Sequence, residues 1–91
     1  MKLYHGTKAL ISKVAEWPKA TKAANGLGFY LTDNREIAEA YGKVIEYVVS
    51  VDYKVELMRR IEVINEKGIE YVLSQREADE LVVDHALEIN Y

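Results

Sequence analysis

The 91-residue sequence contains no cysteine, one proline and two histidines. The absence of cysteine excludes disulfides, thiolate nucleophiles and cysteine-ligated zinc, and two histidines are too few for a histidine-rich metal site. We therefore expect no metal, and any chemistry must come from His, Tyr, Glu and Asp side chains.

Long hydrophobic runs are also missing. No apolar segment approaches the roughly 20 residues that a membrane helix needs, and the N-terminal residues lack the apolar core of a signal peptide. We therefore expect a cytoplasmic protein with no membrane partner. With 49% hydrophobic and 30% charged residues, the composition is typical of a globular chain, and the length predicts a single domain over residues 1–91.

The lysines are unevenly distributed. Five lysines and one glutamate lie in the first 25 residues, and such a basic segment can bind an anionic ligand, such as a dinucleotide diphosphate, or form a solvated surface. The acidic remainder of the chain argues against a large nucleic-acid interface.

Hydrophobic spacing and turn residues predict short strands and helices in one α+β unit. Apolar and β-branched segments predict strands at residues 2–5, 29–32, 44–51, 69–73, 81–84 and 87–91. Helical spacing predicts helices at residues 8–16, after Asp33 and at residues 55–65. The loop of residues 18–28 contains Asn25-Gly26 and Gly28, and we expect it to act as a lid.

Two capping boxes are expected, one from Asp33 to Glu36 and one from Ser74 to Glu77. The first begins the helix after Asp33, which Gly42 ends.

The residues themselves suggest a site. His5 ends the first predicted strand beside Gly6, where a backbone can approach a ligand closely, although a lone histidine at a strand end is more often a surface or capping residue. Tyr30 and Thr32 share one face of their predicted strand. Glu80 directly precedes the predicted strand 81–84, and a carboxylate at the mouth of a buried strand is costly unless it has a partner or a function.

Three segments, in chain order, carry a resemblance to a known enzyme superfamily. They are His5-Gly6-Thr7, then Gly28-Phe29-Tyr30-Leu31-Thr32-Asp33 with Tyr41 eleven residues after Tyr30, and last the segment 79–91 that contains Glu80. Together they resemble the diphtheria-toxin and poly(ADP-ribose) polymerase branch of the ADP-ribosyltransferase superfamily. The third motif of that branch is a Glu-aromatic-Ile-Val strand that begins with the catalytic glutamate, which we place at Glu80. The middle segment is also similar to small bacterial and phage families with a Gly-Phe-Tyr-Leu-Thr signature.

The resemblance implies a fold and a set of ligand contacts. The fold is α+β, with two small antiparallel sheets packed face to face, short flanking helices, and NAD+ in the cleft between the sheets. The main chain of Gly6 binds the nicotinamide carboxamide, and Tyr30 and Tyr41 stack on the nicotinamide ring. His5 bonds the adenosine ribose and Glu80 stabilises the nicotinamide ribose. The catalytic set is therefore Glu80, His5 and Tyr30, and the NAD-binding set is His5, Gly6, Thr7, Tyr30, Thr32 and Tyr41.

The activity implied by the resemblance is mono-ADP-ribosyl transfer from NAD+ to a macromolecular acceptor, most simply a protein, as in a toxin or phage effector. An NAD glycohydrolase and a non-catalytic NAD-binding module are the alternatives within the same fold. Glu77 competes with Glu80 because arginine-modifying toxins use a Gln/Glu-x-Glu motif, and Ala38 stands where polymerases place a carboxamide-binding serine. A ribonuclease that uses His5 or His85 with a glutamate is the alternative outside the family.

Overall fold

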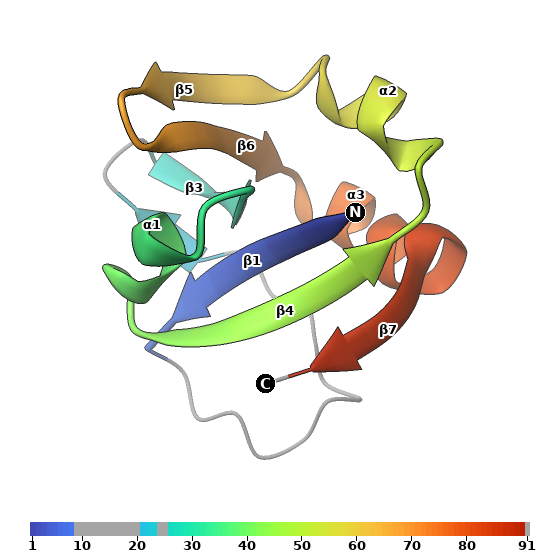
Figure 1. Ribbon diagram of the computed structural model, residues 1–91, viewed down its shortest axis with the longest axis horizontal. Coiled ribbons are helices and arrows are strands. Elements are labelled where there is room, and N and C mark those ends of the chain that lie inside the picture. The colour runs from blue at the N-terminus through green and yellow to red at the C-terminus, as the bar shows by residue number, and fades with distance from the viewer. Residues whose placement is uncertain (9–20, 24–25, 91) are drawn as a thin grey trace.

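The computed structural model of the chain describes residues 1–8, 21–23 and 26–90 (Figure 1). Residues 9–16 of the expected helix lie outside these residues, as do residues 18–20 and 24–25 of the expected lid. The described remainder of that segment, residues 21–23 and 26–28, is strand rather than the loop that we expected. In chain order the elements are β1 (Lys2–Thr7), β2 (Thr21–Ala23), β3 (Gly26–Thr32), α1 (Arg35–Glu39), β4 (Lys43–Val49), α2 (Tyr53–Leu57), β5 (Ile61–Asn65), β6 (Gly68–Leu73), α3 (Gln75–Glu80), the π-helix η2 (Leu81–His85) and β7 (Ala86–Asn90).

The described strands form one antiparallel sheet in the order β5-β6-β3-β1-β4-β7, and β2 pairs with β3. The predicted α+β class is therefore confirmed. The strands do not form the two face-to-face sheets that we expected, because Tyr4 of β1 pairs with Thr32 of β3 and joins the two halves into one sheet. That is the single register pair between β1 and β3 in the part of the chain that the structure describes.

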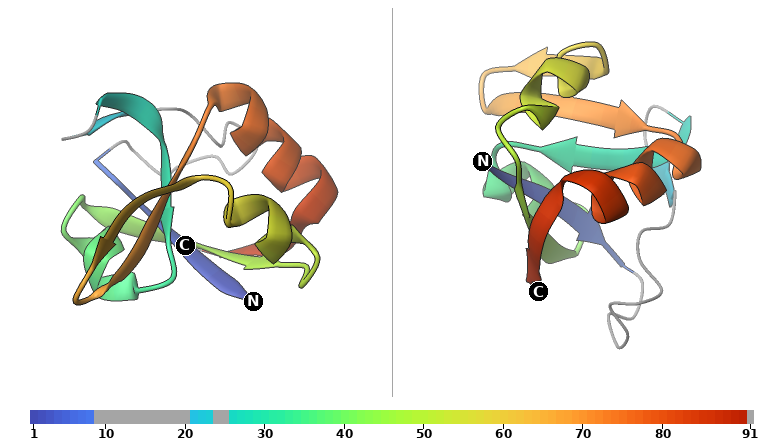
Figure 2. Two further views of the ribbon diagram at one scale, coloured as in Figure 1. Left: turned by 90° about the horizontal axis from the view of Figure 1, so that it is seen from above. Right: turned by 90° about the vertical axis from the view of Figure 1, so that its right-hand side faces the viewer.

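The two faces of this sheet have different partners. Directly opposed residues on antiparallel strands project from the same face, so the register places Leu3, Phe29, Leu31 and Tyr47 together on the face that carries the buried core. The helices α2, α3 and η2 add Tyr53, Leu57, Ala78 and Leu81 to that core. Helix α1 lies on the opposite side of the sheet from α3, as Figure 2 shows.

The expected helix 55–65 is wrong over most of its length. The helix α2 ends at Leu57, and residues 61–65 form β5, in which Ile64 is exposed. The apolar spacing of this segment fits a helix, but its isoleucines and valine also suit a strand. The register pairs Asn65 with Gly68 across a two-residue turn, so hairpin pairing with β6 decides the outcome.

The expected strand 81–84 is also wrong. The capping box at Ser74 and Glu77 is present as predicted and begins α3, and the helical path continues through η2 to His85. Leu81 is completely buried while Val83 is 80% exposed. This segment therefore buries one helical face against the core, and the strand β7 begins only at Ala86.

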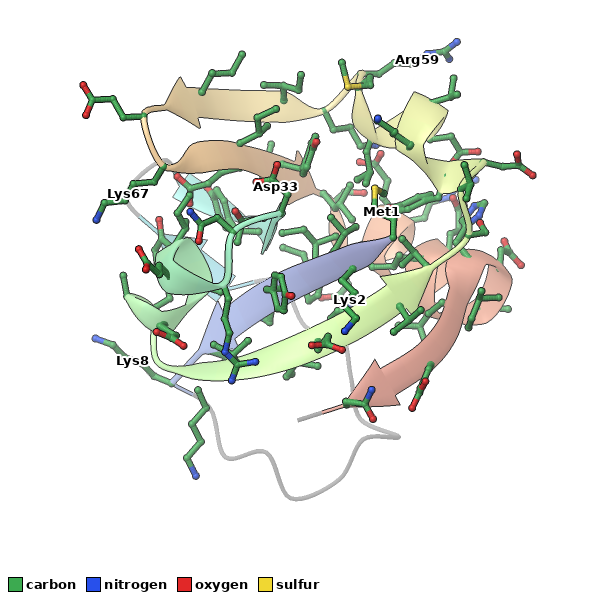
Figure 3. All side chains as sticks on the ribbon, in the orientation of Figure 1. Met1, Lys2, Lys8, Asp33, Arg59 and Lys67 are labelled. Carbon is green, nitrogen blue, oxygen red and sulfur yellow. The ribbon has the colours of Figure 1, made fainter. Side chains whose placement is uncertain are left out.

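The cap of α1 lies one residue later than expected. Asn34, not Asp33, is the N-cap, and its side-chain oxygen accepts a hydrogen bond from the backbone N–H of Glu36 at 2.9 Å. The Asp33 carboxylate instead accepts a hydrogen bond from the backbone N–H of Ile69 at 3.2 Å, and Figure 3 shows Asp33 beside β6. This bond fixes the start of α1 to the sheet.

Among the helices that the structure describes, none combines the length and the apolar character needed to cross a membrane.

A close backbone contact places α1 on the sheet. A Cβ atom added to Gly6 would lie 1.9 Å from the carbonyl oxygen of Ala38, so only glycine allows the last turn of α1 to rest directly on β1. A Cβ atom added to Gly42, which follows the helix with φ +131°, would lie 2.5 Å from the carbonyl oxygen of Thr7. These two contacts determine where Tyr41 lies.

Substitution of Gly6 tests this packing. We expect Gly6→Ala to destabilise the protein by about 1–3 kcal/mol, because the obstructing atom is backbone and α1 must move away. Gly28→Ala is the matched control, since the atom nearest to its added Cβ is a methyl carbon of the Val72 side chain, which can shift. Urea unfolding monitored by circular dichroism measures both free energies of unfolding, and equal losses would contradict the model of a seated helix.

Candidate functional site

The site begins where β1 and β3 diverge. Met1 and Val49 exchange both backbone hydrogen bonds, at 2.8 and 3.1 Å. Because bonded and non-bonded pairs alternate along an antiparallel ladder, the N–H and C=O of Gly6 point away from β4 and toward β3. Past the pair Tyr4–Thr32, β1 has no register partner on β3 among the described residues. The main chain of Gly6 therefore faces the gap between the two strands.

His5 occupies the start of this gap. Its Nδ1 atom lies 2.7 Å from the carbonyl oxygen of Tyr30, and since a carbonyl only accepts, Nδ1 carries the proton and donates. The imidazole stacks on Phe29 with ring centroids 4.1 Å apart and is 1% exposed. Burial lowers the pKa of His5 below its usual value, against a smaller opposing effect of the bond to Tyr30. The side chain is a neutral link between the two strands.

The other expected residues divide between the two faces. Tyr30 and Thr32 share the face that α1 covers, as the spacing predicted, whereas His5 and Thr7 project from the core face. All four side chains are buried, and the Thr32 hydroxyl accepts a hydrogen bond from the backbone N–H of Asn34 at 3.1 Å. His5 therefore contacts the backbone of Tyr30 rather than its ring.

Tyr41 brings a second ring to the face that carries Tyr30. It follows α1 in a turn in which its backbone N–H donates to Ala38 at 3.0 Å. Burial raises the pKa of Tyr41, with further contributions from the hydrogen bond and charge of Glu70 and from the nearby Tyr30. The two tyrosines that the sequence singled out thus lie near each other.

A carboxylate that we did not expect completes this group. Glu70 on β6 stands directly opposite Thr32, is 8% exposed, and accepts a hydrogen bond from the Tyr41 hydroxyl at 3.0 Å. A signal for it was present in the sequence, because the third family motif has an aromatic residue after its glutamate. Glu70 is followed by Tyr71, whereas Glu80 is followed by Leu81.

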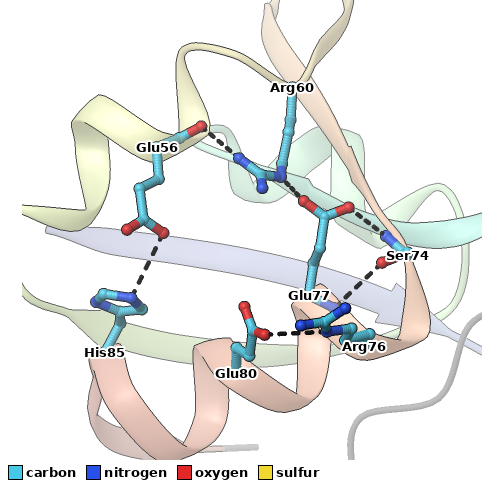
Figure 4. Close-up of polar contacts among 7 residues, drawn as sticks. All are labelled: Glu56, Arg60, Ser74, Arg76, Glu77, Glu80 and His85. Carbon is cyan, nitrogen blue, oxygen red and sulfur yellow. Dashed lines mark hydrogen bonds and ion pairs between the residues drawn. The ribbon is translucent and has the colours of Figure 1, made fainter.

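Glu80 does not begin a strand. It is the last residue of α3, on the other side of the sheet from α1, and its half-exposed side chain forms an ion pair with Arg76 at 3.4 Å (Figure 4). The competing residue Glu77 is part of the α3 capping box and is also paired with Arg60. In the structure, neither glutamate lies in the group that contains Tyr30 and Tyr41.

His85 belongs to this second polar group. Its Nε2 atom lies 3.5 Å from a carboxylate oxygen of Glu56, and its ring stacks on Tyr53 with centroids 4.5 Å apart. Burial raises the pKa of Tyr53 to about 12. His5 and His85 lie in separate groups, so no site joins the two histidines. Among the described residues, no group of three or more His, Cys, Asp or Glu side chains could hold a metal ion.

The neutral, buried state of His5 gives a pH dependence that can be measured. Unfolding exposes an imidazole with a pKa near 6.5, which then takes up a proton that the folded state excludes. Stability therefore falls as the pH drops below about 6.5. We expect the wild-type melting temperature to fall between pH 7.5 and 5.5, and His5→Gln to reduce this dependence. His85→Gln is the control, and an unchanged slope in His5→Gln would contradict burial of the neutral ring.

Comparison of the chain with protein-family models, with curated proteins and with solved structures finds no match. The interpretation of the site therefore depends on the geometry of the described residues. That geometry consists of a main chain facing a gap between strands, two neighbouring tyrosines, and a buried carboxylate bonded to one of them.

Proposed function

We propose that this chain is a mono-ADP-ribosyltransferase that cleaves the nicotinamide glycosidic bond of NAD+, with an ADP-ribosyltransferase-like fold built on the divergence of β1 and β3. The observation that carries the proposal is the buried carboxylate of Glu70, which lies beside Tyr41 on the face that also holds Tyr30. We assign the catalytic carboxylate to Glu70 in place of Glu80.

The residues present fit the nicotinamide end of NAD+. A primary carboxamide needs one donor and one acceptor from the protein, and the N–H and C=O of Gly6 provide both in the gap between β1 and β3. The rings of Tyr30 and Tyr41 suit a flat aromatic leaving group, at about 0.5–1.5 kcal/mol per stacked ring beyond simple burial. The bond from His5 to the Tyr30 carbonyl fixes the backbone that carries one of these rings.

Glu70 supplies the electrostatic part of the reaction. As the glycosidic bond breaks, positive charge develops on the ribose, and the electron pair of the bond leaves with nicotinamide. A carboxylate held nearby in a poorly solvated place stabilises this charge mainly in the transition state. The ribose carbon then takes the attacking oxygen or nitrogen of a protein acceptor, or of water in the glycohydrolase variant, and the acceptor loses a proton.

A pair of glutamine variants tests the assignment. We expect Glu70→Gln to reduce the rate of nicotinamide release from NAD+ by roughly 10²–10³, because it removes the charge and keeps the shape of the side chain. Glu80→Gln is the matched control and should leave the rate within about twofold, since Glu80 forms an exposed ion pair on the other side of the sheet. Chromatographic detection of nicotinamide measures both rates.

The same assay separates the alternatives. Equal rates for wild type and Glu70→Gln would remove Glu70 from the mechanism, and a large loss in Glu80→Gln alone would restore the assignment from sequence. NAD+ labelled in the adenine ring and mixed with a cell extract distinguishes transfer, which labels a macromolecule, from hydrolysis, which yields free ADP-ribose. Calorimetric NAD+ binding without any release of nicotinamide would identify a non-catalytic module.

A further inference from the structure

The contact between Tyr41 and Glu70 joins two groups with separate tasks in the proposed reaction. One is a ring that stacks on the leaving group, and the other is the acid that stabilises the ribose. The hydroxyl oxygen of Tyr41 lies 3.0 Å from Oε1 of Glu70, and it is the donor, because an ionised carboxylate can only accept.

We propose that the Tyr41 hydroxyl is a positioning group that holds the Glu70 carboxylate in the orientation the reaction needs, an inference that rests on the proposed function. Tyr41 thereby does more than stack on nicotinamide. Its hydroxyl acts through Glu70, so the two side chains work as one unit.

The placement of both partners supports this role. Tyr41 is anchored by its backbone bond to Ala38 and by the close seating of α1 on Gly6, so its ring starts from a fixed point. Glu70 is anchored in β6 by its register with Thr32, but a glutamate side chain has three rotatable bonds beyond the backbone. The phenol bond removes much of that freedom.

The bond also leaves the carboxylate able to act. A carboxylate offers two oxygens and about four acceptor positions, so a single phenol bond to Oε1 leaves room for a hydroxyl group of the ribose. Burial is the largest cause of the raised pKa of Tyr41, so the phenol stays protonated and remains a donor across the neutral pH range. Tyr41 orients Glu70 without taking its charge.

The variant Tyr41→Phe tests the contribution of the hydroxyl separately from that of the ring. The variant keeps the aromatic surface that stacks on nicotinamide and loses only the bond to Glu70. For nicotinamide release from NAD+, we expect kcat to fall about tenfold or more, the usual effect of losing a hydrogen bond to a charged group, while KM changes less than about twofold. If Tyr41 only stacked on the ring, both kcat and KM would stay near their wild-type values, because phenylalanine retains the aromatic surface.

Tyr4→Phe is the matched control. Tyr4 lies on the same face of the sheet as Thr32, and its hydroxyl has no role in the proposed reaction, so both kcat and KM should match the wild type. The melting temperature of each variant is measured in parallel. If Tyr41→Phe melts lower, its rate is compared with that of the wild type at a temperature well below both transitions.

The outcomes distinguish this inference from the function on which it rests. A loss in kcat with a nearly constant KM supports the positioning role. An active wild type with an unchanged kcat in Tyr41→Phe overturns that role and leaves the proposed function intact. A wild type that releases no nicotinamide overturns the function, and the positioning role with it.

Discussion

The arrangement depends on how β1 and β3 meet and then separate. They share the register pair Tyr4–Thr32, and beyond it the imidazole of His5 takes the place of the backbone ladder by donating to the carbonyl of Tyr30. This bond therefore links the two strands where they have no further register pair among the described residues. The N–H and C=O of Gly6 point toward β3 in the same region.

The two faces of the sheet carry different kinds of side chain. One face packs Leu3, Phe29 and Tyr47 against α2, α3 and η2 and provides most of the buried apolar surface. The other face carries polar or ionisable side chains, among them Thr32 and Glu70, under a single short helix. Polar residues are tolerated on this face because the main hydrophobic core lies on the other one.

The secondary structure could be predicted from the sequence where a local pattern determines it. The alternation at residues 29–32 and the capping box at Ser74 both led to correct elements, because neighbouring residues carry the signal. It was insufficient at residues 61–65 and 81–85, where apolar residues fit a helix and a strand equally well. Pairing with β6 makes the first segment a strand, and burial of Leu81 against the core makes the second a helix. Neither interaction can be predicted from the few residues around each segment.

The carboxylate illustrates the same limit at the level of function. Its neighbours in the sequence led us to predict Glu80 as the catalytic carboxylate. In the structure the desolvation cost of this carboxylate is small, since it is half-exposed and paired with Arg76. Glu70 is 8% exposed, and the hydrogen bond that it accepts from the Tyr41 hydroxyl offsets part of the desolvation cost of a carboxylate. An apolar residue at this position in β6 would serve the sheet better. The catalytic role that we propose for Glu70 would account for the free-energy cost of burying its carboxylate. That role depends on the pairing of β6 with β3, which places Glu70 opposite Thr32.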